Sequence, residues 1–192
     1  MNLERKEIID LVSFFRIVCN LKRVKRSGWI HKSKITSPES VADHTYLMCV
    51  MSMVLADIMD LDSGHIMKMV NIHDMAESLV GDHIPDEISS EQKQVQEDNA
   101  IKKIISKLPN SLQEKYFDIW KEYNDNITNS AKLVHNLDKL EMALQAKEYE
   151  IDGYSKESLK VFLKSATDYI SNERFDLAFE ILQTINDDSI RI

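Results

Sequence analysis

The chain has 192 residues, of which 43% are hydrophobic and 29% are charged, and these values are typical of one soluble globular domain. The net charge of −8 argues against a general nucleic-acid-binding protein, because a phosphate backbone requires a basic surface. The chain contains only 4 glycines and 3 prolines, which argues against a β architecture with its many turns. The composition therefore favours one helical domain over residues 1–192, with no nucleic-acid polymer as partner.

Apolar residues recur at helical spacing along almost the whole chain, and this spacing predicts an all-α fold of about eight helices. The predicted helices cover residues 3–20, 40–60, 62–80, 90–107, 110–123, 128–150, 155–170 and 173–186. Residues 21–38 and 81–88 are predicted loops. Ser40 and Asp43 form a predicted capping pair, Gly81 ends the third helix, and Ser89 or Ser90 caps the fourth. We expect the domain core at about residues 8–165, with the C-terminal helices packed on it.

Cysteine usage and the apolar runs bear on the location of the protein. Cys19 and Cys49 are the only cysteines, and they lie on apolar stretches without a CxxC spacing, so we expect buried free thiols. No disulfide framework is implied, and the charged N-terminus is followed by no signal-type cleavage site. The longest apolar run, 46–56, is interrupted by Ser52 and is too short to span a bilayer. We therefore expect a cytoplasmic protein without membrane contact.

The adjacent pair His73-Asp74 is the most informative feature of the chain, because it interrupts an otherwise apolar helical run. On a helix, His73 and Glu77 lie one turn apart, whereas His73 and Asp74 point about 100° apart. Both members of the pair can reach one ion only in a crevice where other helices add ligands. His44 and Asp138 are the candidates for those ligands.

Two imidazoles and two carboxylates form a mixed nitrogen and oxygen donor set. This set suits a divalent transition metal such as Mn, Co, Fe, Ni or Zn better than Ca or Mg. The segment 73–82 holds four ionisable groups among apolar residues, namely His73, Asp74, Glu77 and Asp82. Burying all four without a metal or strong partners would cost on the order of several kcal/mol. Glu77 is placed to orient a water molecule, and Asp82, beyond the helix end, could bond a substrate hydroxyl or donate a proton.

A basic interval precedes the second predicted helix. No Asp or Glu occurs between Asp10 and Glu39, although acidic residues outnumber basic ones by 32 to 24 over the chain. A local positive field in an acidic protein attracts a small dianion, and the planar fork of an arginine suits phosphate oxygens. The interval holds Arg16, Lys22, Arg23, Lys25, Arg26, Lys32 and Lys34.

The order His44, His73-Asp74, Asp138 reproduces the H…HD…D signature, so the chain resembles the HD-domain metal-dependent phosphohydrolases. Residues 38–44 and 73–85 resemble the corresponding segments of one branch, the HD-domain 5'-deoxynucleotidases. The segment Arg26-Ser-Gly-Trp29 resembles the Arg-x-Gly-Trp of its eukaryote-like and archaeon-like members, whereas bacterial members have adjacent Arg and Trp. The resemblance covers about residues 8–165.

The resemblance implies a role for each matching residue. His44, His73, Asp74 and Asp138, called the ligand set below, would bind one divalent transition metal ion. Glu77 would assist the attacking water, and Asp82 would lie near the sugar 3'-hydroxyl and the reaction centre. Arg26 would hold the phosphate, and Trp29 would lie beside the nucleotide. The implied enzyme is a homodimeric 5'-deoxynucleotidase, which converts deoxynucleoside 5'-monophosphates to deoxynucleosides and phosphate.

Two alternatives stay open. One is another HD reaction, either triphosphohydrolysis of dNTPs or cleavage of a cyclic or alarmone nucleotide, although the expected extra basic and histidine elements are missing. The other is a non-catalytic nucleotide-binding module, which the intact ligand set and Glu77 argue against. Glu141, Gln145 and Glu148 follow Asp138 at helical spacing. They could touch the pocket, a neighbouring subunit or solvent, and we expect solvent or an interface.

Overall fold

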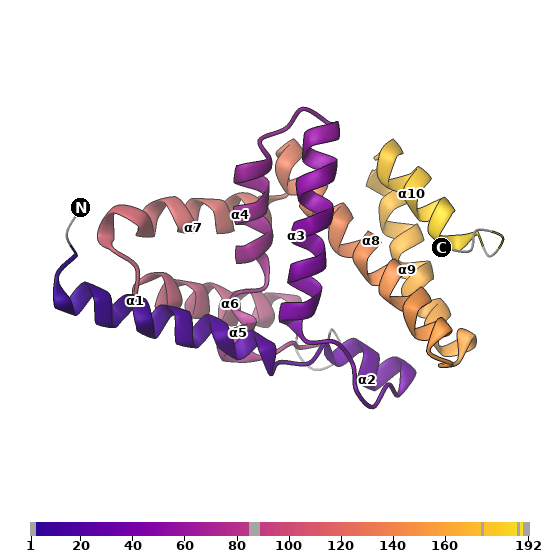
Figure 1. The fold of residues 1–192 in the computed structure, drawn as a ribbon, viewed down its shortest axis with the longest axis horizontal. Helices are drawn as coiled ribbons and strands as arrows, with labels where there is room; N and C mark the ends of the chain where they lie inside the picture. The colour runs from indigo at the N-terminus through magenta and orange to yellow at the C-terminus, as the bar shows by residue number, and fades with distance from the viewer. Residues whose placement is uncertain (1–2, 85–88, 174, 188, 190–192) are drawn as a thin grey trace.

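The computed structural model describes residues 3–84, 89–173, 175–187 and 189, and these residues form helices without a β-strand (Figure 1). The predicted all-α class is confirmed. The elements are α1 (Arg5–Val18), the 3-10 helix η1 (Cys19–Lys22), α2 (Ser27–Ser33), α3 (Val41–Ile58), α4 (Ser63–His73), α5 (Glu77–Val80), α6 (Ser90–Ile105), α7 (Asn110–Asp125), α8 (Asn129–Ile151), α9 (Lys156–Glu173) and α10 (Asp176–Asn186).

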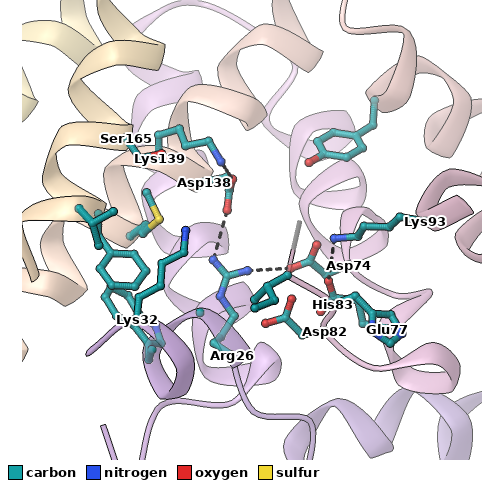
Figure 2. Close-up of a pocket in the computed structure, with 17 residues that line it drawn as sticks. Arg26, Lys32, Asp74, Glu77, Asp82, His83, Lys93, Asp138, Lys139 and Ser165 are labelled. Atoms are coloured by element: carbon teal, nitrogen blue, oxygen red, sulfur yellow. Dashed lines mark hydrogen bonds and ion pairs between the residues drawn. The ribbon is translucent and has the colours of Figure 1, made fainter. Parts of the chain in front are cut away.

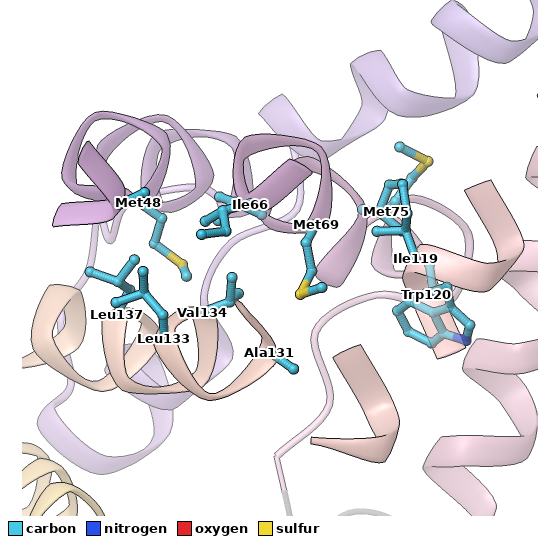
Figure 3. Close-up of a cluster of buried hydrophobic side chains, with 14 of the residues drawn as sticks. Met48, Ile66, Met69, Met75, Ile119, Trp120, Ala131, Leu133, Val134 and Leu137 are labelled. Carbon is cyan, nitrogen blue, oxygen red and sulfur yellow. The ribbon is translucent and has the colours of Figure 1, made fainter. Parts of the chain in front are cut away.

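The long helix α8 organises the core, because it packs against α3, α4, α9 and α10. Figure 1 shows α3 and α4 side by side, with α9 and α10 beyond α8. Each large apolar side chain that becomes fully buried contributes about 2 kcal/mol to the stability of the fold. The buried side chains between α3, α4 and α8 therefore fix these three helices relative to one another. The buried side chains that meet there are Met48, Ile66, Met69, Leu133, Val134 and Leu137 (Figure 3).

The predicted loop 21–38 contains the second half of η1 and the whole of α2, so this part of the prediction is wrong. Helix α2 has only seven residues and no apolar repeat of its own. Its order comes from Trp29, which is buried with its ring centroid 5.1 Å from that of Tyr149 and 4.0 Å from that of Phe162. Tertiary packing therefore stabilises a helix that local propensity does not predict.

The predicted helix 62–80 is divided into α4 and α5. The amide of Met75 donates to the carbonyl of Ile72 at 3.0 Å, and the amide of Glu77 donates to the carbonyl of Asp74 at 3.1 Å. These bonds span three residues instead of four, so the chain turns at Asp74, whose φ and ψ are −106° and 10°. The prediction of a continuous helix is wrong, and the turn changes how the side chains of this segment meet.

The predicted caps are confirmed. Ser40 and Asp43 form a capping box at the start of α3, and Ser89 caps α6. Gly81 follows α5 with a φ of 83°, a conformation that favours glycine. The capping box also sets the first turn of α3, on which a candidate metal ligand lies.

The expectation of buried cysteines, and that of an apolar run too short to span a bilayer, both need correction. Cys19 is exposed and Cys49 is half-buried, and both are free thiols, so the prediction of buried thiols is wrong for Cys19. Helix α3, with 18 residues and a mean hydropathy of 1.3, is long and apolar enough by length and composition to cross a membrane. A core helix of a globular protein meets the same criteria, and α3 packs against α4 and α8.

Candidate metal centre and phosphate pocket

The ligand set comes from three helices that the core holds together. His44 lies on the first turn of α3, His73 is the last residue of α4 and Asp74 its C-cap, and Asp138 lies within α8. The Nε2 atom of His44 lies 3.4 Å from Asp138 Oδ1 and 3.8 Å from Asp74 Oδ2. The Nε2 atom of His73 lies 3.1 Å from the same Asp74 oxygen. The structure therefore brings together the four residues that the sequence singled out.

The unpaired polar atoms of this cluster fit a metal ion. Ligand atoms of His44, His73 and Asp74 all lie within 4.8 Å of one another. Among the residues that the structure describes, His44 Nε2, His73 Nε2 and Asp74 Oδ2 are buried without a hydrogen-bond partner. Leaving such atoms unsatisfied costs about 1–3 kcal/mol each, whereas a cation would bind all three. Nitrogen and carboxylate donors together suit a divalent transition metal.

Both histidine rings are oriented by a partner on the far nitrogen. The Nδ1 atom of His73 lies 2.6 Å from the carbonyl oxygen of Val70, and the Nδ1 atom of His44 lies 2.5 Å from Glu141 Oε2. Each ring thus directs Nε2 into the cluster. Burial and Arg26 lower the pKa of His44, but Glu141 and Asp138 outweigh them and raise it to about 9.

Arg26 lies between two carboxylates of the ligand set (Figure 2). Its Nη1 atom is 3.6 Å from Asp74 Oδ2 and its Nη2 atom is 3.5 Å from Asp138 Oδ1. Burial would lower the pKa of Arg26, but the carboxylates of Asp138 and Asp74 raise it overall, so the guanidinium stays charged. Burial would raise the pKa of Asp74, yet His73 and Arg26 hold it well below its usual range. Arg26 therefore offsets negative charge at the mouth of the cluster.

Glu77 is the first residue of α5, and its side chain is only 3% exposed. Burial raises the pKa of this carboxyl well above its ordinary value, and the charges of Asp74 and Asp82 raise it further. Lys93 of α6 approaches it, with Nζ 3.9 Å from Glu77 Oε1. The turn after α4 places Glu77 beside Asp74 without a continuous helix.

Asp82 anchors the start of α2. Its Oδ2 atom accepts a hydrogen bond of 2.6 Å from the amide of Ser27, and its carbonyl accepts one of 2.6 Å from Ser27 Oγ. Trp29 anchors the same helix to the core, because its Nε1 donates to Glu39 Oε1 at 2.9 Å and its side chain is only 1% exposed. These two contacts place Arg26, which directly precedes α2, over the ligand set.

A pocket of about 310 Å³ opens above the cluster. Figure 2 shows Asp82, Glu77 and Lys93 on one side of Arg26, and Lys32, Lys139 and Ser165 on the other. Apolar side chains of α8 and α9 also line the pocket, among them Met142 and Val161. The pocket thus contains carboxylates, among them Asp74 and Asp138 of the ligand set, several lysines, and a partly apolar wall from α8 and α9.

Comparison with known proteins identifies the family. Residues 18–177 match the family model described as the HD domain. The chain is 43% identical over 142 residues to the 5'-deoxynucleotidase HDDC2 of Homo sapiens, which covers 73% of this chain and 69% of that protein. It is 42% identical over 167 residues to the protein of the same name from Dictyostelium discoideum. This match covers 83% of this chain and 87% of that protein. The chain belongs to the HD-domain family.

Solved structures of other proteins share this HD-domain fold. A crystal structure of a Pyrococcus horikoshii protein has a TM-score of 0.77 at 28% identity, over 91% of this chain and 97% of that one. The crystal structure of a predicted metal-dependent phosphohydrolase from Magnetospirillum magnetotacticum has a TM-score of 0.66 at 20% identity, over 95% of this chain and 96% of that one. At this identity the match supports the fold alone. The resemblance seen in the sequence is therefore confirmed at the level of family and fold.

The sequence-based prediction misplaced one residue of this site, Glu141, and missed another, Lys93. Glu141, expected at solvent or an interface, is 1% exposed and contacts His44, so that expectation is wrong. Its position three residues after Asp138 was a usable signal, since such residues share a helix face. Lys93 carried no signal, because it lies on a strongly polar helix with many equivalent lysines and glutamates.

Proposed function

We propose that the protein is a metal-dependent phosphomonoesterase that hydrolyses deoxynucleoside 5'-monophosphates to nucleoside and phosphate. The observation that carries the proposal is the buried His and Asp cluster opening into a pocket beside a charged, buried arginine. The relatives named 5'-deoxynucleotidase support the choice of substrate, including the preference for deoxyribose.

The ligand set would hold one divalent ion, with Mn, Co, Fe, Ni and Zn as the candidates. Such an ion polarises a phosphoryl group and lowers the pKa of a water molecule. The guanidinium of Arg26 would bind phosphate oxygens through its planar fork and offset the charge that develops on them. In this proposal Arg26 exchanges its carboxylate partners for the phosphate when the nucleotide binds.

Glu77 would orient the attacking water and accept its proton. Its Oε2 atom is buried and makes no hydrogen bond to the described residues, so it is available for a water molecule. Burial raises the pKa of this carboxyl well above its ordinary value, which makes its carboxylate a stronger base than an exposed one. Lys93, near the other oxygen of Glu77, would keep the carboxylate from turning away.

Asp82 and the apolar wall would receive the nucleoside. Because Asp82 Oδ2 is bonded to the amide of Ser27, the sugar hydroxyl would meet Oδ1. The base would lie toward Met142 and Val161, since a planar ring gains most from apolar contacts. Trp29, with 1% exposure, would support the substrate through α2 and offer it little direct surface.

The test is an activity screen on the purified protein with 5'- and 3'-monophosphates of ribo- and deoxyribonucleosides, after chelation and add-back of each metal. We expect orthophosphate release from the 5'-deoxy substrates only with metal, and loss of that activity in His73→Ala and Asp74→Ala. With dNTPs and cyclic or alarmone nucleotides added to the screen, hydrolysis of these substrates, with release of triphosphate or pyrophosphate, would favour another HD reaction. Tight nucleotide binding without turnover under every metal would favour a non-catalytic module.

We also propose that the chain is one domain over residues 1–192 and acts as a cytoplasmic homodimer without nucleic-acid or membrane partners. A row of exposed apolar side chains at four-residue spacing on α3 supports the dimer: Tyr46, Val50, Val54 and Ile58. Light scattering of the wild type and of Val54→Lys would test it. A monomeric wild type, or binding of the wild type to liposomes, would contradict this part of the proposal.

A further inference from the structure

Glu141 is a buried carboxylate whose position the proposed reaction leaves unexplained. It lies on α8, three residues after Asp138, and is 1% exposed. Its Oε2 atom lies 2.5 Å from Nδ1 of His44, a ring that is itself fully buried. Burying a carboxylate is costly unless a hydrogen-bond donor or a cation compensates it, so this contact is the main reason that the site tolerates Glu141.

We propose that Glu141 is a positioning residue, whose carboxylate holds the His44 imidazole with Nε2 directed at the carboxylates of Asp74 and Asp138. The inference rests on the proposed metal site. An Nδ1–H that donates to a carboxylate leaves the Nε2 lone pair for an ion, and the negative charge makes that nitrogen a better donor to the ion. One helix, α8, would thus supply both a direct ligand and the group that orients a ligand on α3.

The neighbouring groups explain why Glu141 has this role alone. Glu39 also lies within 4.8 Å of the His44 and Glu141 cluster, but its Oε1 accepts the indole N–H of Trp29. His73 has a backbone carbonyl, that of Val70, as partner for its Nδ1. A carbonyl orients the ring without adding a full charge. Of the two imidazoles, His44 is therefore the one whose strength as a ligand depends on a side chain that can be replaced.

Three variants test the inference. Glu141→Ala removes the acceptor, and Glu141→Gln keeps an acceptor without the charge. Glu148→Gln makes the same chemical change on the same helix at an exposed position and serves as the control. The readouts are Co²⁺ affinity of the chelated protein by calorimetry, the visible absorption spectrum of bound Co²⁺, and the far-UV circular dichroism of each variant.

We expect Co²⁺ affinity to fall about 10–100-fold in Glu141→Ala and less in Glu141→Gln, as is typical of lost partners of metal-binding histidines. The Co²⁺ spectrum should change in Glu141→Ala, whereas Glu148→Gln should match the wild type. Wild-type affinity and spectrum in a folded Glu141→Ala would overturn the proposal. If Glu141→Ala fails to fold, wild-type Co²⁺ affinity in Glu141→Gln overturns the proposal, since loss of the charge alone should weaken binding.

These readouts separate the inference from the proposed function. A wild-type protein that binds Co²⁺ but hydrolyses no nucleotide would refute the nucleotidase and leave the role of Glu141 testable through affinity. A wild-type protein that hydrolyses nucleotides, with an unchanged Co²⁺ affinity in both Glu141 variants, would refute the positioning role alone.

Discussion

Replacing Arg26 with methionine should destabilise the metal-free protein more than the metal-loaded one. The guanidinium lies 3.6 Å from Asp74 and 3.5 Å from Asp138, and all three side chains are 16% exposed. Removing one partner from such a buried group costs about 3 kcal/mol. For a domain of this size each kcal/mol corresponds to about 2–4 °C, so the Tm of the chelated protein should fall by about 6–12 °C.

A bound divalent cation offsets the charge of the same two carboxylates, and it should therefore stabilise Arg26→Met by more than it stabilises the wild type. The assay is thermal unfolding followed by circular dichroism, with chelator and with excess Mn²⁺. Arg23→Met, an exposed position in the same basic segment, is the control. Equal losses of Tm in the two variants, or an equal gain from metal in Arg26→Met and the wild type, would refute this account of Arg26.

Two further substitutions separate chemistry from stability. Glu77→Gln should lower kcat about 100-fold or more with Mn²⁺ affinity nearly unchanged, because Glu77 would move a proton without belonging to the ligand set. A parallel loss of Mn²⁺ affinity would instead place Glu77 among the ligands. Burial, and then the charge of Glu141, raise the pKa of Glu39 from 4.5 to about 7. Because the folded state favours the neutral carboxyl of Glu39, this group contributes its full stability to the fold below pH 4.5. That contribution is lost as the pH rises through 7 and the buried group becomes charged. Glu39→Gln, which still accepts the Trp29 bond, should recover at most about 3 kcal/mol at pH 8 and nothing at pH 4.5 in the chelated protein. A difference in unfolding free energy that does not vary with pH would contradict this.

The helices that were predicted well are those whose burial repeats along the chain. Leu133, Leu137 and Leu140 of α8 are all buried, and their spacing alone indicates one apolar helix face. The same criterion fails after His73, because Met75 and Ala76 remain buried although the chain turns there. A periodic pattern of apolar residues shows which side chains face the core. The pattern does not reveal a short turn when the side chains on both sides of the turn still face the core.

The candidate site also has parts that the sequence predicts and parts that depend on tertiary packing. The sequence predicted that the four residues of the ligand set lie together, because ionisable side chains in an apolar context need partners or a metal ion. The face of α8 that Glu141 shares with Asp138 was readable from the sequence, but its contact with Nδ1 of His44 depends on how closely α8 packs against α3, which spacing alone does not give. The order of α2 depends on contacts between Trp29 and residues more than 100 positions later in the chain, so local sequence could not predict it.

The missed helix connects the fold to the proposed chemistry. Arg26 would have to exchange two carboxylates for a phosphate without losing its place, and this requires a rigid attachment of its backbone. Trp29, packed against Tyr149 and Phe162, fixes α2 from the core, and Asp82 fixes its first residue through two hydrogen bonds. Only the guanidinium of Arg26, which two ion pairs already hold, would then have to be redirected when a nucleotide binds, and this keeps the entropic cost of holding the phosphate small.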